Sequence, residues 1–274
     1  MGDAKRRKQQ LQNGAPDPRD ADRLMDDFPL PPPRTSADPG AVAEQAREIR
    51  RLAGLLRQDG AGVRAAPDKL AALGEVITRL ALPRLEEGIA SFTEAMDDIP
   101  AVPIGCAKGC DWCCRQPVEA TIPEAIAAAR ILLALPADAR RAKAAEVAAF
   151  DVERRAAGAE VPIRPCPFLG PDDGACTIYA ARPMACRSYL APEPERCRLA
   201  FAALAEGRIA DEANSYIWPR YLGHAYLAAV CGIARDAALQ SDPVELSAAV
   251  AAILADPGLV DRWQAGERVF TPIR

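Results

Sequence analysis

Cysteine is the residue type in this chain with the most chemical potential, because eight of the nine cysteines fall between residues 106 and 197. Thiolates bind zinc and iron, and clustered cysteines in a reducing compartment more often hold metal or do redox work than form disulfides. The first four follow the pattern C-x3-C-x2-C-C, and the other four are spread at wider intervals. The candidate metal ligands are Cys106, Cys110, Cys113, Cys114, Cys166, Cys176, Cys186 and Cys197.

The chain has a single histidine, His224, so a large metal site would have to be built almost entirely from thiolate. The same scarcity removes most histidine-based catalysis, including Ser-His and Cys-His triads. Hard cations such as Mg²⁺ and Ca²⁺ are excluded because they require oxygen ligands. Zinc in two four-cysteine sites and iron–sulfur clusters both fit the donor set, and the residues alone leave this choice open.

The first cysteine group is compatible with two local structures. On a helix, its four sulfurs would project within a wedge of about 100° and could serve one centre. In a loop, Gly105 and Gly109 would let backbone N–H groups approach the sulfurs and stabilise their negative charge. Polar Lys108, Asp111 and Arg115 interleave the cysteines, so this segment does not read as a buried apolar strip.

A four-thiolate site around zinc, or around an oxidised four-iron cluster, carries a net charge of −2, and burying that charge requires donors or cations nearby. Several basic residues lie within a few positions of a cysteine. Of these, we expect Arg182 and Arg187 to help bind the cofactor by lying beside the metal–thiolate site and offsetting part of its negative charge. The aromatic Phe168, Tyr179 and Tyr189 are expected to form walls of the site rather than to take part in chemistry.

Not every cysteine is expected to play the same part. Cys231 lies in the apolar stretch Leu-Ala-Ala-Val-Cys-Gly-Ile-Ala, where a free cysteine is usually a small core residue. Adjacent Cys113 and Cys114 cannot easily share one tetrahedral ion, so one of them is expected to bridge to a second metal or to belong to a second site.

The second cysteine group matches no short-knuckle zinc pattern, but its surroundings are distinctive: CPFL at 166–169, GACTIY at 174–179 and RPMACR at 182–187. Together with C-x3-C-x2-C-C, these elements resemble the YkgJ-type cysteine-cluster family, described as a zinc- or iron-chelating domain. The resemblance covers about residues 104–198. It implies that the first seven cysteines are ligands, and we add Cys197 because it lies at a similar spacing in the polar run Pro-Glu-Arg-Cys-Arg.

One branch of that family contains the flagellin lysine N-methylases, which resemble iron–sulfur and S-adenosylmethionine dependent proteins. This branch implies a slight preference for iron–sulfur over zinc and gives one alternative function, a protein lysine N-methylase. A structural-zinc module that binds a protein partner is the other alternative. Radical S-adenosylmethionine chemistry is disfavoured, because alanine-rich helices rather than alternating strands are expected after Cys114.

The elements around the cysteines are expected to be helical, because the chain is rich in alanine and only 5% aromatic. We predict a mainly α fold, a helical scaffold with a loop-rich cysteine-cluster region and a short strand near 118–122. The Thr121-x-x-Glu124 spacing is that of a capping box. The expected helices span 41–60, 68–96 with a bend at Pro83, 123–135, 137–155, 199–207, 216–237 with an interruption at Pro219, and 243–255.

This pattern divides the chain into four parts: a disordered Pro-rich tail at 1–40, a helical segment at 41–103, the cysteine-cluster region at 104–198 and a helical segment at 199–274. The net charge of −4 and the sequence pI near 5.3 make nucleic acid an unlikely partner. No apolar run is long enough for a membrane span, and the polar start lacks a secretory signal. We therefore expect a cytoplasmic protein that does not bind a membrane. Its helical flanks are compatible with a protein partner, and the residues leave any small-molecule substrate unidentified.

Overall fold

The computed structural model describes residues 39–97, 104–107, 109–157, 164–206 and 215–273. Apart from its last two residues, the tail predicted at 1–40 lies outside these ranges. Among the described residues, no helix is long and apolar enough to cross a membrane.

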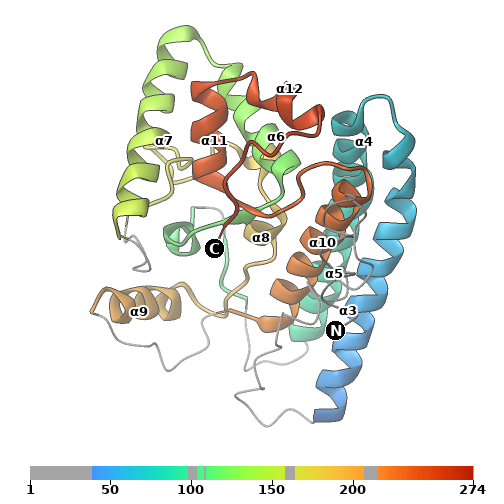
Figure 1. Cartoon of the computed structure of the whole chain (residues 1–274). Helices are drawn as coiled ribbons and strands as arrows, with labels where there is room; N and C mark the ends of the chain where they lie inside the picture. Colours follow the sequence, from blue (N-terminus) through green and yellow to red (C-terminus); the bar gives the residue numbers. More distant parts are fainter. Residues whose placement is uncertain (1–38, 98–103, 108, 158–163, 207–214, 274) are drawn as a thin grey trace, which may run out of the picture.

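The described chain is mainly α, as predicted, and its helices form two groups (Figure 1). In the first group, α10 packs against three helices from the N-terminal part of the chain. The segment η1 also contacts α10, and its Gly60 permits a close approach because a Cβ there would meet the side chain of Ile233. The members of this group are α3 (Pro39–Asp59), the 3₁₀ segment η1 (Gly60–Ala65), α4 (Lys69–Val76), α5 (Leu82–Asp97) and α10 (Ile217–Asp236).

In the second group, α11 packs against α6, α7 and α12 (Figure 1). A two-residue strand precedes α6 and pairs antiparallel with a second one, so that Glu119 faces Glu245 and Ala120 faces Val244. The strand expected near 118–122 is thereby confirmed. The members of this group are β1 (Glu119–Ala120), α6 (Ile122–Leu133), α7 (Ala137–Ala157), β2 (Val244–Glu245), α11 (Leu246–Ala255) and α12 (Leu259–Gln264).

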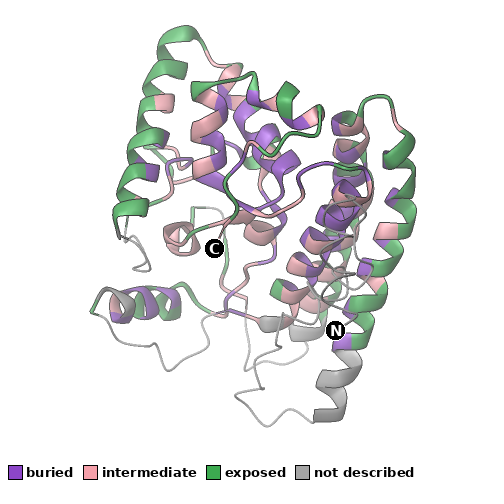
Figure 2. Ribbon diagram, viewed as in Figure 1, coloured by how far each residue is buried: buried purple, intermediate pink, exposed green. Residues whose placement is uncertain are grey.

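A single hydrophobic core joins the two groups, and its buried residues lie on the faces that the helices turn inward (Figure 2). Leu222 and Val230 bring α10 into it, Ile126 brings α6, and Trp263 brings α12. The connection is direct, because α4 packs against α6. The cysteine-bearing segments are therefore attached to one continuous scaffold.

Two prolines in the predicted helices have different effects. Before Pro83 the structure has the π-helical segment η2 (Ile77–Ala81), because proline cannot donate a hydrogen bond to the preceding turn. The helical stretch predicted at 68–96 is thus divided into α4, η2 and α5, and the bend predicted at Pro83 stays a prediction. The interruption predicted at Pro219 is wrong, because α10 begins at Ile217 and Pro219 lies in its first turn, where the backbone N–H groups have no partner within the helix.

Other boundaries also differ from the expected ones. The helix predicted at 199–207 is α9 (Pro194–Ala205), which begins with a proline at its first position and therefore contains Cys197. The helix predicted from residue 243 begins at Leu246, because Val244 and Glu245 form β2 instead. Helix α12 had no counterpart among the predicted elements.

Glu124 joins the scaffold to the cysteine region. The predicted capping box is present: the Thr121 hydroxyl accepts from the Glu124 N–H, and Glu124 Oε2 accepts from the Thr121 N–H at 2.9 Å. The second carboxylate oxygen of Glu124, Oε1, accepts from the N–H of Met184 at 2.8 Å. Met184 is the first residue of α8 (Met184–Arg187), which contains Cys186, so one buried carboxylate holds the starts of two helices together.

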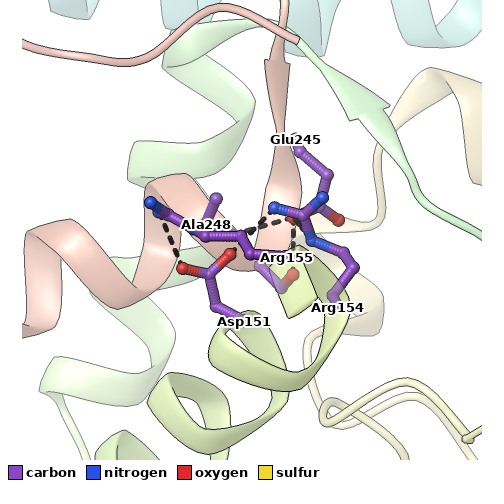
Figure 3. Close-up of polar contacts among 6 residues, drawn as sticks. Asp151, Arg154, Arg155, Glu245 and Ala248 are labelled. Carbon is purple, nitrogen blue, oxygen red and sulfur yellow. Dashed lines mark hydrogen bonds and ion pairs between the residues drawn. The ribbon is translucent and has the colours of Figure 1, made fainter. Parts of the chain in front are cut away.

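A second polar cluster holds α7 against the start of α11 (Figure 3). Asp151 accepts from Arg154 at 2.9 Å and pairs with Arg155 at 2.7 Å, and Arg154 Nε lies 3.2 Å from Glu245. Glu245 in turn caps α11 by accepting from the Ala248 N–H. Because Asp151 and Glu245 are buried, their pairing with Arg154 fixes the position of α7. Helix α7 also contacts the cysteine region, since the Lys143 ammonium donates to the carbonyl of Pro167, the residue after Cys166.

We predict that Glu124→Ala lowers the free energy of unfolding by about 2–3 kcal/mol, because it removes a cap and leaves the buried Met184 N–H without an acceptor. Glu124→Gln keeps one carbonyl acceptor and should cost less. Urea denaturation followed by circular dichroism measures both changes. The exposed Glu75 of α4 gives the matched control, Glu75→Ala, which should change little. Equal midpoints for Glu124→Ala and Glu75→Ala would contradict the role given to Glu124.

Candidate metal centre

The first cysteine group lies in a loop that ends in the 3₁₀ turn η3 (Trp112–Arg115). Residues 104–107, 109 and 110 have no helical structure, and Gly109 has a φ of 89°, a backbone conformation that favours glycine. Of the two local structures considered for this segment, the loop is therefore correct for Cys106 and Cys110, whereas Cys113 and Cys114 lie in the short turn.

This loop is fastened to the residues that lead into α9. The Gly105 N–H donates to the carbonyl of Ala191 at 3.1 Å, and the Ala191 N–H donates to Sγ of Cys106 at 3.2 Å. A Cβ on Gly105 would lie 2.6 Å from the carbonyl oxygen of Pro192, so only glycine permits this approach. Helix α9 packs against η3, and its Cys197 is buried with 3% of its surface exposed.

The second cysteine group begins with a backbone contact to the first, because the Cys166 N–H donates to the carbonyl of Cys114 at 2.7 Å. The chain then folds back on itself. The N–H of Thr177 donates to the carbonyl of Phe168 at 2.7 Å, and Leu169 and Cys176 form an isolated antiparallel bridge. Gly174 permits the reversal with a φ of 63°.

Arg182 and Arg187 hold the last part of this group together. The Arg182 guanidinium donates to the carbonyl of Cys186, and Nε of Arg187 donates to the carbonyl of Arg182 at 2.8 Å. Both guanidinium groups lie within 6 Å of the ring of Tyr179, at 5.8 and 5.9 Å, and that tyrosine is 61% exposed. Arg187 also pairs with Glu86 of α5 at 2.8 Å, which ties α8 to the first helix group.

Gly223 of α10 lets α8 lie close to the scaffold, because a Cβ there would collide with the side chain of Ser188. Phe168 is buried in the common core, Tyr189 is half-buried under the guanidinium of Arg220, and Tyr179 faces outward. Two of the three expected wall residues are therefore covered, and the third lies at the surface.

Burial controls the protonation of most of these thiols. It raises the pKa of Cys166 and of Cys186 to about 12 and that of Cys197 to about 11, and it also raises the pKa of Cys106 and Cys176. Arg182 acts in the opposite direction on Cys106, Cys176 and Cys186, because a cation favours the thiolate.

Cys113 is affected first by its neighbour. A hydrogen bond with Cys114 is the largest cause that raises the pKa of Cys113, followed by burial, and the cation of Arg182 lowers it. The adjacent thiols are therefore in contact. In the part of the chain that the structure describes, no group of three or more His, Cys, Asp or Glu side chains is already arranged as a metal site.

Cys231 and His224 lie away from this region, on α10. Cys231 is buried in the hydrophobic core, and burial raises its pKa. His224 Nδ1 lies 3.3 Å from a carboxylate oxygen of Glu119 on β1. Lys108, one of the basic residues beside the first group, lies outside the described residues, whereas Arg115 pairs with Asp111 at 2.8 Å.

Sequence reasoning did not identify two contributors to the region. Ala191 anchors the first loop through its backbone, and an alanine carries no side-chain signal for such a role. Burial, Cys186 and Cys176 raise the pKa of Cys166, and Glu245 lies close enough to raise it further. No motif connects Glu245 to the cysteines, so only the fold reveals this proximity.

The comparisons with known proteins bear on the same segment. Residues 105–205 match the family model CxxCxxCC, which is described as a "Putative zinc- or iron-chelating domain". The resemblance to the YkgJ-type cysteine-cluster family is confirmed over this stretch. Searches of curated proteins and of solved structures found no match. The family model thus covers both cysteine groups together with α6, α7, α8 and α9, and the helices before residue 105 and after residue 205 lie outside it.

We predict that metal binding by this region releases protons and becomes tighter as the pH rises. The buried thiols have raised pKa values and are neutral at pH 7, whereas the metal requires thiolates. With more than one proton released per metal, the apparent affinity should rise by more than about tenfold per pH unit between pH 6 and 8. Calorimetric titrations with Zn²⁺ in buffers of different ionisation enthalpy measure the number of protons released per metal ion. Binding that is independent of pH would contradict the prediction.

Proposed function

We propose that residues 104–198 bind a metal centre through cysteine thiolates, and that the centre is either an iron–sulfur cluster or zinc. The observation that carries the proposal is the meeting of two distant cysteine segments, because the backbone contact between Cys114 and Cys166 joins them within the stretch that matches a chelating family. The proposed ligands are Cys106, Cys110, Cys113, Cys114, Cys166, Cys176, Cys186 and Cys197.

The surroundings of the cysteines fit such a centre in their chemistry. The donors are soft sulfur atoms, which zinc and iron–sulfur clusters prefer. Backbone N–H groups approach the sulfurs, as the one from Ala191 to Cys106 does, and Arg182 supplies positive charge to cysteines of both groups. These features support the binding of an anionic metal–thiolate centre, because its charge would otherwise be costly to bury.

The family resemblance favours iron–sulfur slightly, because the lysine N-methylase branch resembles iron–sulfur dependent proteins. An iron–sulfur cluster would supply electron transfer, whereas zinc would supply structural linkage between the segments. Either centre requires reduced thiols, which is consistent with the proposed cytoplasmic location. A metal-stabilised domain that binds a protein partner is compatible with both metals.

Purification of the full chain without oxygen, followed by analysis of iron, zinc and acid-labile sulfide, tests the proposal. Iron with sulfide and visible absorption would identify an iron–sulfur centre, and zinc without colour would identify the other. We predict that Cys176→Ser and Cys186→Ser lower the metal content, because each removes a thiolate donor.

Cys231→Ser gives the matched control, because Cys231 is a buried cysteine outside the region. It should keep the full metal content, provided that circular dichroism shows a folded chain. A wild-type chain that carries no metal and binds neither Zn²⁺ nor reconstituted iron and sulfide would refute the proposed function.

We further predict that Arg182→Gln weakens Zn²⁺ binding by about tenfold or more, which is the usual effect of removing a group that supports the ligands. Arg182→Lys keeps the charge but not the planar fork and should recover part of the loss. Competition with a chromophoric chelator measures the affinity.

Arg198→Gln is the control for the Arg182 variants, because Arg198 is an exposed arginine of α9 that pairs with Glu195 at 2.6 Å. It should leave the affinity unchanged. If Arg182→Gln and Arg198→Gln bound Zn²⁺ equally well, Arg182 would have no electrostatic role at the centre.

A further inference from the structure

The described contacts of the cysteines fall into two neighbourhoods. Around the first loop, burial raises the pKa of Cys197 and the nearby thiols of Cys106, Cys110 and Cys113 add to the rise. Around the second loop, burial raises the pKa of Cys166, and Cys186 and Cys176 add to it. These electrostatic influences divide the cysteines into two sets. No three of the described side chains are already arranged as a metal site, so metal binding would draw the members of each set together.

Backbone geometry supports the first neighbourhood independently. Gly105 and Cys106 are bonded to Ala191, three residues before the start of α9, and η3 packs against α9. The turn that carries Cys113 is therefore placed beside the helix that carries Cys197. This arrangement makes Cys197, the ligand with the weakest sequence support, a member of the first set rather than of the second.

Backbone geometry also supports the second neighbourhood. The bridge between Leu169 and Cys176 closes the loop that begins at Cys166, and the bond from Arg182 to the Cys186 carbonyl places α8 against the same loop. The bond from the Cys166 N–H to the Cys114 carbonyl brings the last residue of the first motif to this side.

The adjacent cysteines lie on the border between the two neighbourhoods. Cys113 contributes to the pKa shifts of Cys106 and Cys197, and its own shift comes first from its contact with Cys114. Among the thiols that raise the pKa of Cys186 after burial, Cys113 comes before Cys176, so Cys113 lies at the junction of the two neighbourhoods. Cys114 is bonded through its carbonyl to the Cys166 N–H, whereas the turn that contains Cys113 packs against α9, so the peptide bond between the two cysteines runs from one set to the other.

We propose that the eight cysteines form two separate four-thiolate centres, the first from Cys106, Cys110, Cys113 and Cys197 and the second from Cys114, Cys166, Cys176 and Cys186. This inference rests on the proposed metal-binding function and adds the number of centres and the ligands of each. The peptide bond between Cys113 and Cys114 then connects the two centres, and Arg182 lies close enough to both to offset part of their combined negative charge.

Counting Zn²⁺ bound to the metal-free full-length chain under reducing conditions tests this division. The wild-type chain should bind two equivalents. Cys110→Ser and Cys197→Ser should each bind one, and the double variant of these two should still bind one, because both changes fall in the same centre. Cys176→Ser should also bind one equivalent.

The double variant Cys110→Ser with Cys176→Ser decides between two centres and one. Because it damages both proposed centres, it should bind no Zn²⁺ tightly. If single substitutions such as Cys110→Ser abolish all binding, the eight cysteines form one polynuclear centre and the division is wrong. If Cys197→Ser with Cys176→Ser still binds one equivalent, Cys197 is not in the first set. A wild-type chain that binds no metal would instead refute the proposed function itself.

Hydrogen exchange in α9 provides a second measurement that does not depend on stoichiometry. Zn²⁺ should slow exchange of the α9 amides in Cys176→Ser, where the first centre is intact, and not in Cys110→Ser, where it is lost. The matched control Cys231→Ser should bind two equivalents and protect α9 as the wild type does. Equal protection of α9 in Cys176→Ser and Cys110→Ser would overturn the assignment.

Discussion

The carboxylate of Glu124 is the interaction on which the arrangement of the cysteine region depends. One of its oxygens completes the cap of α6, and the other accepts from the start of α8, sixty residues later in the chain. Burial raises the pKa of Glu124, and the N–H groups of Met184 and Thr121 counteract that rise. A buried carboxylate that accepts several hydrogen bonds has a fixed position, so α8 and Cys186 inherit their place from the scaffold.

The two cysteine groups differ in how firmly the scaffold holds them. The second is tied to α6 through Glu124, to α7 through the Lys143 bond to Pro167 and to α5 through the pair between Arg187 and Glu86. The first is held by backbone bonds to Ala191 and by packing between η3 and α9. Bound metal would therefore contribute a larger share of the stability of the first group, since fewer apolar contacts are available to it.

The sequence predicted those features that depend on local chemistry. The capping box at Thr121 and Glu124 identified the start of α6, because both partners lie within one turn. Proline at position 83 indicated a departure from regular helix, and the form it takes, a π-helical segment before Pro83, came from the structure. The motifs around Cys166, Cys176 and Cys186 indicated the YkgJ-type cysteine-cluster family, and the family model confirms this resemblance over residues 105–205.

Features that depend on distant contacts were not predictable in the same way. Pro219 has the same chemistry as an interrupting proline, and only its place in the first turn of α10 makes it harmless. The anchoring of Cys106 depends on the backbone of Ala191, and the position of Cys197 depends on a helix that begins earlier than its apolar pattern suggested. Spacing alone could therefore name the candidate cysteines but could not group them.

The attachment of α9 has a consequence for the rate at which metal exchanges. Among the described residues α9 packs mainly against the short turn η3, and a helix held in this way can separate by a local opening at a lower free energy than global unfolding requires. The second loop has no such independent cover, because α6, α7 and α8 belong to the common scaffold. Two centres that each have four sulfur donors of their own would thus differ in kinetic lability. The one beneath α9 would exchange its metal quickly with the surroundings, and the other would retain it.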